Sequence, residues 1–230
     1  MNSGPRRPQV FPASAPSLIE TIRIDVGGTV PLLDGHLARL QRSATILGYP
    51  WSGEAPVRAE IARAASELDT QRCWRLRVLL GPEGELTLEH SALEAPAAVY
   101  KVVLNGPRPR ADEDWLLHKS THRPWYAAAT QWLAAHPEIF DVLYWNEDED
   151  MCEGSRTNLY MQSREGQWLT PRLSAGVLPG VQRQALLDAG QVHEARITRA
   201  DFVNAKAIRI SNALRGWRNA VVVDQEDDAG

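Results

Sequence analysis

Residues 106–114 read GPRPRADED, and this run of glycine, proline, arginine and acids predicts a break in the fold. Such a composition is typical of an exposed segment that joins two compact parts of a chain. We therefore expect a smaller lobe over residues 18–110 and a larger lobe over residues 111–224. The Pro-rich residues 1–17 and the acidic residues 225–230 are expected to form a loose lead-in and a frayed tail.

Upstream of this break the sequence predicts strands and helices in mixed order. Apolar-biased runs at 17–25 and 29–33 are separated by VGG, which favours a β-hairpin. Apolar residues at helical spacing then predict a helix with Asp34 as its N-cap and Gly48 as its stop. A second hairpin is expected over residues 73–90.

Downstream of the break the pattern is similar. Proline and glycine at 179–180 predict the start of a helix, and apolar runs predict several short strands. Because strands and helices do not alternate regularly, the pattern favours an α+β architecture over a doubly wound sheet. The remaining expected elements are a helix over 124–136 and strands over 140–147, 158–163, 167–171 and 207–214.

Charge and composition exclude several classes of protein. The net charge of −4 and the pI near 5.9 provide no basic field for nucleic acid. No apolar run approaches the roughly 18 residues of a membrane span, and the first residues lack the apolar core of a signal peptide. With only two cysteines, the chain suits a reducing compartment, so we expect a cytoplasmic protein.

A lysine stands out in the segment 115–126, WLLHKSTHRPWY. Of 25 basic residues only Lys101, Lys119 and Lys206 are lysines, so the composition favours arginine at solvated positions. A lysine can lose its proton and attack a carbonyl carbon, whereas an arginine stays charged. Lys119 is therefore a candidate nucleophile. The alternative is an ordinary exposed lysine at the boundary of an element.

Three further clusters carry weaker signals. Glu153 in MCEGSRTNLY is an acid in an apolar setting, although a carboxylate beside a turn also serves as a cap. The segment LPGVQR could present free amides at a helix start, and SNALRG places small polar residues after a buried strand. His118 and His122 lack the acid of a zinc helix, so no metal site is expected. Ser155 lacks the glycines of a nucleophile elbow.

Taken together and in this order, these clusters resemble the fold-type IV family of pyridoxal-phosphate enzymes. The resemblance runs from about residue 18 to residue 216 and implies a two-lobed, D-amino-acid aminotransferase-like fold with the cofactor in the cleft between the lobes. It also implies a homodimer. The segments that carry it are HKSTHRPWYAAA, DVLYWNEDEDMCEGSRTNLY, LTPRLSAGVLPGVQR and ISNALRGW.

Each motif carries an implied role at its own position. Lys119 would be the Schiff-base lysine, and Glu153 would pair with the pyridine nitrogen and keep it protonated. Arg39 in GHLARL would bind the phosphate. The remaining implied cofactor contacts are the amides of Val181 and Gln182 and the turn formed by Ser211, Asn212 and Ala213.

The resemblance is greatest to aminodeoxychorismate lyases, which implies conversion of 4-amino-4-deoxychorismate to 4-aminobenzoate and pyruvate, a step of folate biosynthesis. The candidates for binding the substrate carboxylates are Arg215, then Arg123 and Arg77. The planar, forked guanidinium group of arginine matches the geometry of a carboxylate. A Pro-rich lead-in stands where the family has an opening strand. The resemblance therefore does not identify all residues of the substrate pocket. The alternatives are a branched-chain or D-amino-acid aminotransferase on the same fold, and a non-catalytic binding protein.

Overall fold

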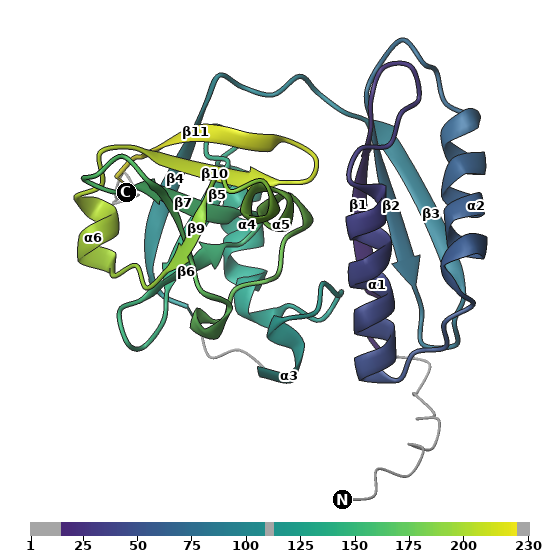
Figure 1. The fold of residues 1–230 in the computed structure, drawn as a ribbon, viewed down its shortest axis with the longest axis horizontal. Coiled ribbons are helices and arrows are strands. Elements are labelled where there is room, and N and C mark those ends of the chain that lie inside the picture. The colour runs from purple at the N-terminus through teal and green to yellow at the C-terminus, as the bar shows by residue number, and fades with distance from the viewer. Residues whose placement is uncertain (1–14, 109–112, 225–230) are drawn as a thin grey trace, which may run out of the picture. The chain divides into compact units, whose positions relative to one another are not determined.

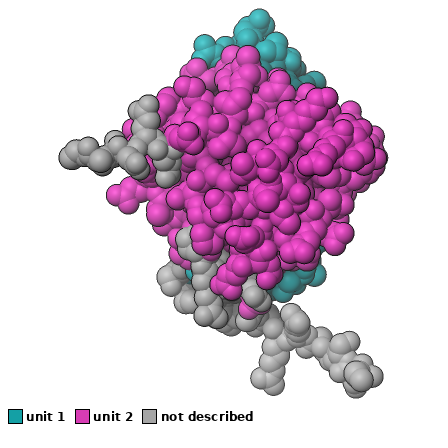
Figure 2. Space-filling model, turned by 90° about the vertical axis from the view of Figure 1, so that its left-hand side faces the viewer, with its two compact units in different colours: residues 1–93, 119–122 teal, residues 94–118, 123–230 magenta. Residues whose placement is uncertain are grey.

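The computed structural model describes residues 15–108 and 113–224 (Figure 1). The chain forms two compact units, shown in different colours in Figure 2. Unit 1 consists of residues 1–93 and 119–122, and unit 2 consists of residues 94–118 and 123–230. The predicted lead-in and tail lie outside the described residues, except for 15–17.

Unit 1 is a three-stranded antiparallel sheet in the order β1-β2-β3 with two helices. Every second side chain of β1 is buried, as the pleat of a strand dictates when one face packs on helices. The elements are β1 (Leu18–Ile24), α1 (Leu33–Leu47), α2 (Glu54–Ser66), β2 (Trp74–Leu80) and β3 (Leu86–Ala92).

The structure corrects the first predicted hairpin. β1 pairs with β2, not with residues 29–33. A turn forms instead, in which the Gly28 amide donates to the Asp25 carbonyl at 2.9 Å. Pro31 has no amide proton for a ladder, and the helix that follows begins after Leu32, whose φ is 60°.

Two other predictions in this unit are confirmed, and one is wrong. β2 and β3 form the expected hairpin. Helix α1 ends at Gly48, whose φ of 78° is the left-handed conformation that glycine adopts at little cost. Asp34 is not the N-cap but lies in the first turn, where it accepts a hydrogen bond from Arg58 at 2.6 Å.

Unit 2 is built on an eight-stranded mixed sheet in the order β6-β5-β4-β11-β10-β7-β8-β9. The pairs β4·β11, β4·β5 and β8·β9 are parallel and the other pairs are antiparallel. The strands are β4 (Val99–Pro107), β5 (Asp141–Trp145), β6 (Met151–Gly154), β7 (Asn158–Gln162), β8 (Trp168–Pro171), β9 (His193–Ala195), β10 (Ile208–Asn212) and β11 (Gly216–Val222).

Short helices accompany this sheet. They are α3 (Glu113–Leu116), α4 (Ala127–Ala135), α5 (Val181–Asp188) and α6 (Arg199–Val203). The predicted helix starts at Pro124 as a 3-10 turn over Pro124–Tyr126 and continues as α4. None of the helices in the described ranges is long and apolar enough to cross a membrane.

Strands β4 and β11 show where the boundary between the two units differs from the predicted one. Strand β4 pairs with β5 and β11, so its residues belong to unit 2, whereas the sequence placed residues up to 110 in the first lobe. Strand β11, which the sequence analysis did not predict, lies between β4 and β10. Its run GWRNAVV mixes charge and glycine, so the apolar alternation that marks a strand is weak.

Candidate active site

Glu153 is the buried acid at the centre of the predicted site in unit 2. It lies on β6 and is only 4% exposed. The Tyr126 hydroxyl donates to Oε1 at 3.0 Å, and the Leu178 amide donates to Oε2 at 2.9 Å. Asn158 Nδ2 donates weakly to Oε2 at 3.4 Å. Three elements therefore hold this carboxylate in one orientation.

The turn after Glu153 is organised by Asp141, a residue that the sequence analysis missed. The fully buried Asp141 carboxylate accepts hydrogen bonds from Ser155 Oγ at 2.7 Å and Thr157 Oγ1 at 2.6 Å. A Cβ on Gly154 would stand 2.1 Å from Asp141 Oδ2, so only glycine allows this approach. The motif EGSRT is thus a turn wrapped around a buried acid. Ser155 has a structural role.

Burial raises the pKa of Glu153, because a charged carboxylate is costly in a poorly solvated site. The charges of Arg123 and Arg108 and the two strong hydrogen bonds oppose this rise. The Arg123 guanidinium lies over the Tyr126 ring, 4.7 Å from its centroid. The pKa of Tyr126 is also raised, first by burial and then by the Glu153 charge, so its hydroxyl stays a donor.

The N-terminus of α5 lies close to this acid. Asn158 links the two, because its Nδ2 donates to the Leu178 carbonyl at 3.0 Å while its Oδ1 faces Gly180. A Cβ at Gly180 would meet that Oδ1 at 1.9 Å, so glycine is required for this packing. The Gln184 amide donates to the Gly180 carbonyl at 2.9 Å.

The predicted phosphate contacts follow from this helix start. The amides at the first helical positions have no partner within a helix. Val181 and Gln182 occupy these positions, and among the described residues no side chain caps them. Their partial positive charge and the helix dipole favour an anion.

Sheet register brings Ser211 to the same region. Ser211 on β10 stands directly opposite Asn158 on β7. Its Oγ shares a 2.7 Å hydrogen bond with the Tyr160 hydroxyl, and it is 2% exposed. Asn212 Oδ1 accepts the Arg215 amide at 2.9 Å and closes the turn that contains Ala213. The structure therefore places Glu153 and the predicted phosphate turn in one unit.

Arg39, the predicted phosphate ligand of unit 1, lies in a buried ionic cluster. Its Nε and Nη2 donate to the two oxygens of Glu20 at 2.8 and 2.6 Å. His36 Nδ1 lies 2.6 Å from Glu20 Oε2, and His36 Nε2 is buried without a hydrogen-bond partner among the described residues. Burial acts to raise the pKa of Glu20, but Arg39 and His36 outweigh it and lower the pKa to about 2.

Glu20 therefore orients Arg39, and we predict its effect on stability. Replacing Glu20 with glutamine removes the Glu20 counter-charge from the buried Arg39 guanidinium, so the free energy of unfolding should fall by about 3–5 kcal/mol. The wild-type contribution should be present above pH 4.5 and disappear as the pH falls toward 2. Urea unfolding measures both effects.

The control for this prediction is an exposed ion pair of the same unit. Glu54 pairs with Arg58 at 2.5 Å, and both side chains are well exposed. Replacing Glu54 with glutamine should therefore cost less than about 1 kcal/mol. If Glu20→Gln costs no more than Glu54→Gln, Glu20 does not have the proposed role.

Lys119 begins the segment 119–122, which belongs to unit 1, whereas the residues before and after this segment belong to unit 2. Its carbonyl accepts the Ile19 amide at 2.8 Å, and Ser120 forms a bridge with Leu18. The segment therefore extends the edge of β1, and it holds the half-buried Lys119 on a backbone that is fixed at several points.

The three candidate substrate arginines differ in their surroundings. Arg77 Nε is buried without a hydrogen-bond partner in the described part of the chain and lies 4.0 Å from a Glu89 oxygen. Arg215 Nη1 donates to the Glu94 carbonyl, and Arg123 stacks on Tyr126. Arg77 is on β2 of unit 1, while Arg123 and Arg215 belong to unit 2.

A buried carboxylate and an uncapped helix start, held together on this mixed sheet, fit a pyridoxal-phosphate enzyme of fold type IV. A family model described as amino-transferase class IV matches residues 17–222. The chain belongs to the class IV aminotransferase family, whose members use pyridoxal phosphate. Fold class and cofactor predicted from the sequence are thereby confirmed.

Individual relatives carry different names. A Schizosaccharomyces pombe protein named "Putative aminodeoxychorismate lyase" is 28% identical over 219 residues, 93% of this chain and 92% of that protein. A "Probable branched-chain-amino-acid aminotransferase" of Thermotoga maritima is 27% identical over 156 residues, 66% of this chain and 55% of that protein. The solved structure of a "Putative amino-acid aminotransferase" from Mesorhizobium loti is 35% identical, with a TM-score of 0.80, and the match covers 91% of this chain and 100% of that chain.

The residues of unit 2 fit this cofactor. A carboxylate has about four acceptor positions, and the hydrogen bonds from Tyr126, Asn158 and Leu178 fill three of those of Glu153. A protonated pyridine nitrogen would occupy the fourth and supply the counter-charge that this buried acid favours. The open amides at Val181 and Gln182 suit a phosphate.

Proposed function

We propose that this chain is a lyase that uses pyridoxal phosphate to convert 4-amino-4-deoxychorismate into 4-aminobenzoate and pyruvate. The observation that carries the proposal is the buried, hydrogen-bonded Glu153 beside the uncapped start of α5. Similarity to a relative with a lyase name over nearly the full length of both chains supports the choice of reaction.

Bound pyridoxal phosphate supplies an aldehyde that bonds to amines and a ring that accepts electrons. In the proposed enzyme, Glu153 holds a proton on the ring nitrogen, and the Val181 and Gln182 amides, Ser211 and Arg39 bind the phosphate. The proposal requires Arg39 and Lys119 of unit 1 to reach the same cofactor as Glu153.

Lys119 moves the proton in the proposed reaction. Its neutral Nζ takes the proton from the substrate carbon that bears the nitrogen, acting as a general base. The resulting ammonium then donates a proton to the departing three-carbon fragment. The two products contain every atom of the substrate, so the step needs neither an oxidant nor water.

Arg77 is our first choice for a substrate carboxylate. A buried guanidinium nitrogen without a hydrogen-bond partner gains most from an anionic ligand. Arg215 already donates to a backbone carbonyl and Arg123 packs on an aromatic ring, so these two rank lower than Arg77. We also propose a homodimer, as the resemblance to the family implies, and a cytoplasmic location, which suits a chain with only two cysteines.

A product assay tests the proposal. The purified protein is loaded with pyridoxal phosphate, its occupancy is measured, and substrate is generated by the synthase that aminates chorismate. We expect pyruvate and 4-aminobenzoate in equal amounts. Absence of both products at full occupancy would rule out the lyase.

The second candidate is an aminotransferase, favoured by the 35% identity to the Mesorhizobium loti structure over the whole of that chain. An aminotransferase returns the proton to the cofactor instead of releasing a leaving group. Adding an amino acid would then convert the bound cofactor into its amine form, which absorption spectra detect. A lyase would leave this spectrum unchanged.

A further inference from the structure

The loop over residues 172–180 leads from β8 into α5, and it contacts Glu153 on the way. The Leu178 amide donates to Glu153 Oε2 at 2.9 Å. Helix α5 begins three residues later, at Val181. The conformation of this loop therefore sets both the orientation of the buried carboxylate and the direction of the first helical amides.

Arg108 holds this loop from the end of β4. Its own amide donates to the Trp145 carbonyl at 2.7 Å, which ties its backbone to β5. Its Nη1 donates to the Gly176 carbonyl at 2.5 Å, two residues before Leu178. A hydrogen bond from a charged guanidinium is stronger than one between neutral groups. Arg108 therefore connects the loop firmly to the parallel strands β4 and β5.

Gly176 allows the guanidinium to approach the loop. Its φ of 81° is in the left-handed region, and a Cβ at this position would lie 2.4 Å from Arg108 Nη2. A second anchor is weaker. The Cys152 thiol, next to Glu153 in the chain, donates to the Ala175 carbonyl at 3.1 Å, and a thiol is a poor donor. Arg108 is thus the stronger of these two anchors.

The charge of Arg108 also acts on the strand that carries Glu153. Burial raises the pKa of Glu153, and the charges of Arg123 and Arg108 are among the interactions that oppose this rise. Burial likewise raises the pKa of Cys152 to about 12, and the Arg108 charge opposes that rise too. Two neighbouring groups of β6 therefore lie within electrostatic reach of the guanidinium.

We propose that Arg108 is a positioning residue of the active site, which fixes the loop before α5 so that the Leu178 amide stays directed at Glu153. The inference rests on the proposed role of Glu153 at the ring nitrogen of the cofactor. Without Arg108 the loop would keep the hydrogen bond from Asn158 to the Leu178 carbonyl but lose its charged link at Gly176. Glu153 would then be less well oriented toward the ring nitrogen.

Binding of pyridoxine 5′-phosphate to the whole, cofactor-free chain tests this inference. This compound has the ring nitrogen and the phosphate but no aldehyde, so its affinity depends neither on a bond to Lys119 nor on any reaction. Arg108→Gln should raise its dissociation constant about tenfold, which corresponds to about 1.4 kcal/mol. Arg108→Lys can still donate to the Gly176 carbonyl and should stay within about threefold of the wild type. Equilibrium dialysis measures each constant.

Gly176→Ala is a second, independent variant for the same contact. Its Cβ would displace the Arg108 guanidinium, so it should weaken binding of pyridoxine 5′-phosphate to a similar extent as Arg108→Gln. The two substitutions lie far apart in the sequence and share only this contact. Equal affinity of Gly176→Ala and the wild type would contradict the inference.

A double-mutant cycle shows whether Arg108 acts through Glu153. Glu153→Gln alone should raise the dissociation constant at least about tenfold, because a charge-assisted contact to the ring is lost. Adding Arg108→Gln to this variant should raise it by less than about threefold more, since the two residues act on one contact. A purely structural role for Arg108 would instead lower the resistance to urea and leave the two effects multiplicative.

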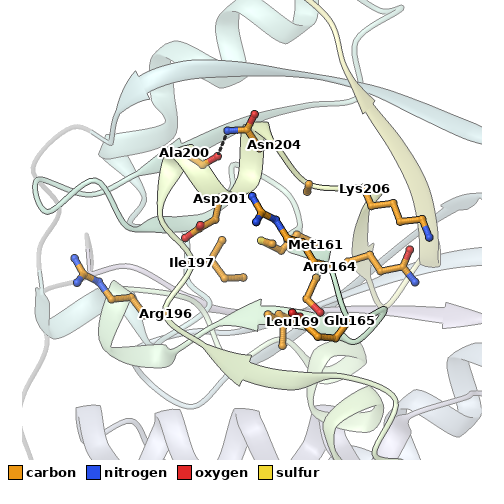
Figure 3. Close-up of a pocket in the computed structure, with 13 residues that line it drawn as sticks. Met161, Arg164, Glu165, Leu169, Arg196, Ile197, Ala200, Asp201, Asn204 and Lys206 are labelled. Atoms are coloured by element: carbon orange, nitrogen blue, oxygen red, sulfur yellow. Dashed lines mark hydrogen bonds between the residues drawn. The ribbon is translucent and has the colours of Figure 1, made fainter.

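Arg196→Gln is the matched control. Arg196 lines the pocket beside α6 that Figure 3 shows, and its Nε donates to both oxygens of Asp150 at 2.7 and 3.0 Å, directly before β6. None of the described residues that line this pocket belongs to the 172–180 loop. Removing this exposed ion pair should change the dissociation constant by less than about twofold.

The outcomes separate this inference from the proposed function. The inference fails if Arg108→Gln binds pyridoxine 5′-phosphate as tightly as the wild type, if Arg108→Lys binds no better than Arg108→Gln, or if the effects of Arg108→Gln and Glu153→Gln multiply. An unchanged affinity of Glu153→Gln would contradict the proposed role of Glu153 itself, and this inference with it.

Discussion

Replacing Lys119 with alanine should lower product formation by about 10⁴-fold, the upper range for removal of a catalytic acid or base. The proposed reaction uses the same amine for covalent attachment and for proton transfer, so its loss removes both functions. Steady-state rates of pyruvate release measure the effect, at equal occupancy by pyridoxal phosphate.

Two further variants define what Lys119 supplies. Lys119→Arg keeps the charge and much of the length, yet it should be as inactive as alanine, because a guanidinium does not lose its proton at accessible pH. Lys101→Ala removes an exposed lysine of β4 and should leave the rate unchanged. An active arginine variant would contradict the role of Lys119 as base.

Replacing Glu153 with glutamine should lower the rate by about 10²- to 10³-fold, the range for loss of one preorganised electrostatic contact. Glutamine has nearly the same shape but cannot keep the ring nitrogen protonated. It also places an amide nitrogen near the Tyr126 hydroxyl or the Leu178 amide, both of which are donors to Glu153. Rates at full cofactor occupancy measure the catalytic effect.

The same variant has a second, pH-dependent effect in the cofactor-free protein. Because burial raises the pKa of Glu153, the folded state binds this proton more tightly than the unfolded state does. The contribution of Glu153 to stability is therefore present at low pH and declines as the pH rises through its raised pKa. The difference in unfolding free energy between wild type and Glu153→Gln should change in this direction between pH 4 and pH 8.

An exposed acid controls for the loss of one negative charge. Glu147 lies on the surface before β6, and Glu147→Gln should change neither the rate nor the pH dependence of stability. If Glu153→Gln retained the wild-type rate, Glu153 would have no electronic role, and the proposed chemistry would lose its support in unit 2.

Local patterns in the sequence predicted the elements that depend on few residues. The start of α5 after Pro179 and the stop of α1 at Gly48 follow from backbone geometry that proline and glycine fix locally. The β2–β3 hairpin follows from a short turn between two apolar runs. Each of these signals lies within a few residues of the element that it defines.

Contacts between distant residues could not be predicted from such patterns. Asp141 holds the turn after Glu153 by hydrogen bonds to Ser155 and Thr157, which lie 14 and 16 positions further along the chain, and in the sequence it reads as a polar residue at a strand start. Glu20 reads as one residue of an apolar strand, and only its pairing with Arg39 shows why a buried acid is tolerated. Ser211 lies opposite Asn158 because of the pairing register of β7 and β10, and this register cannot be read from either segment alone.

The most direct test of the proposed enzyme is to identify the lysine that binds the cofactor. The protein is loaded with pyridoxal phosphate, reduced with borohydride and digested, and the peptides are analysed by mass spectrometry. With only three lysines in the chain, the assignment is unambiguous. We predict a phosphopyridoxyl group on Lys119. A group on Lys101 or Lys206 instead, or no modified lysine at full occupancy, would contradict the account.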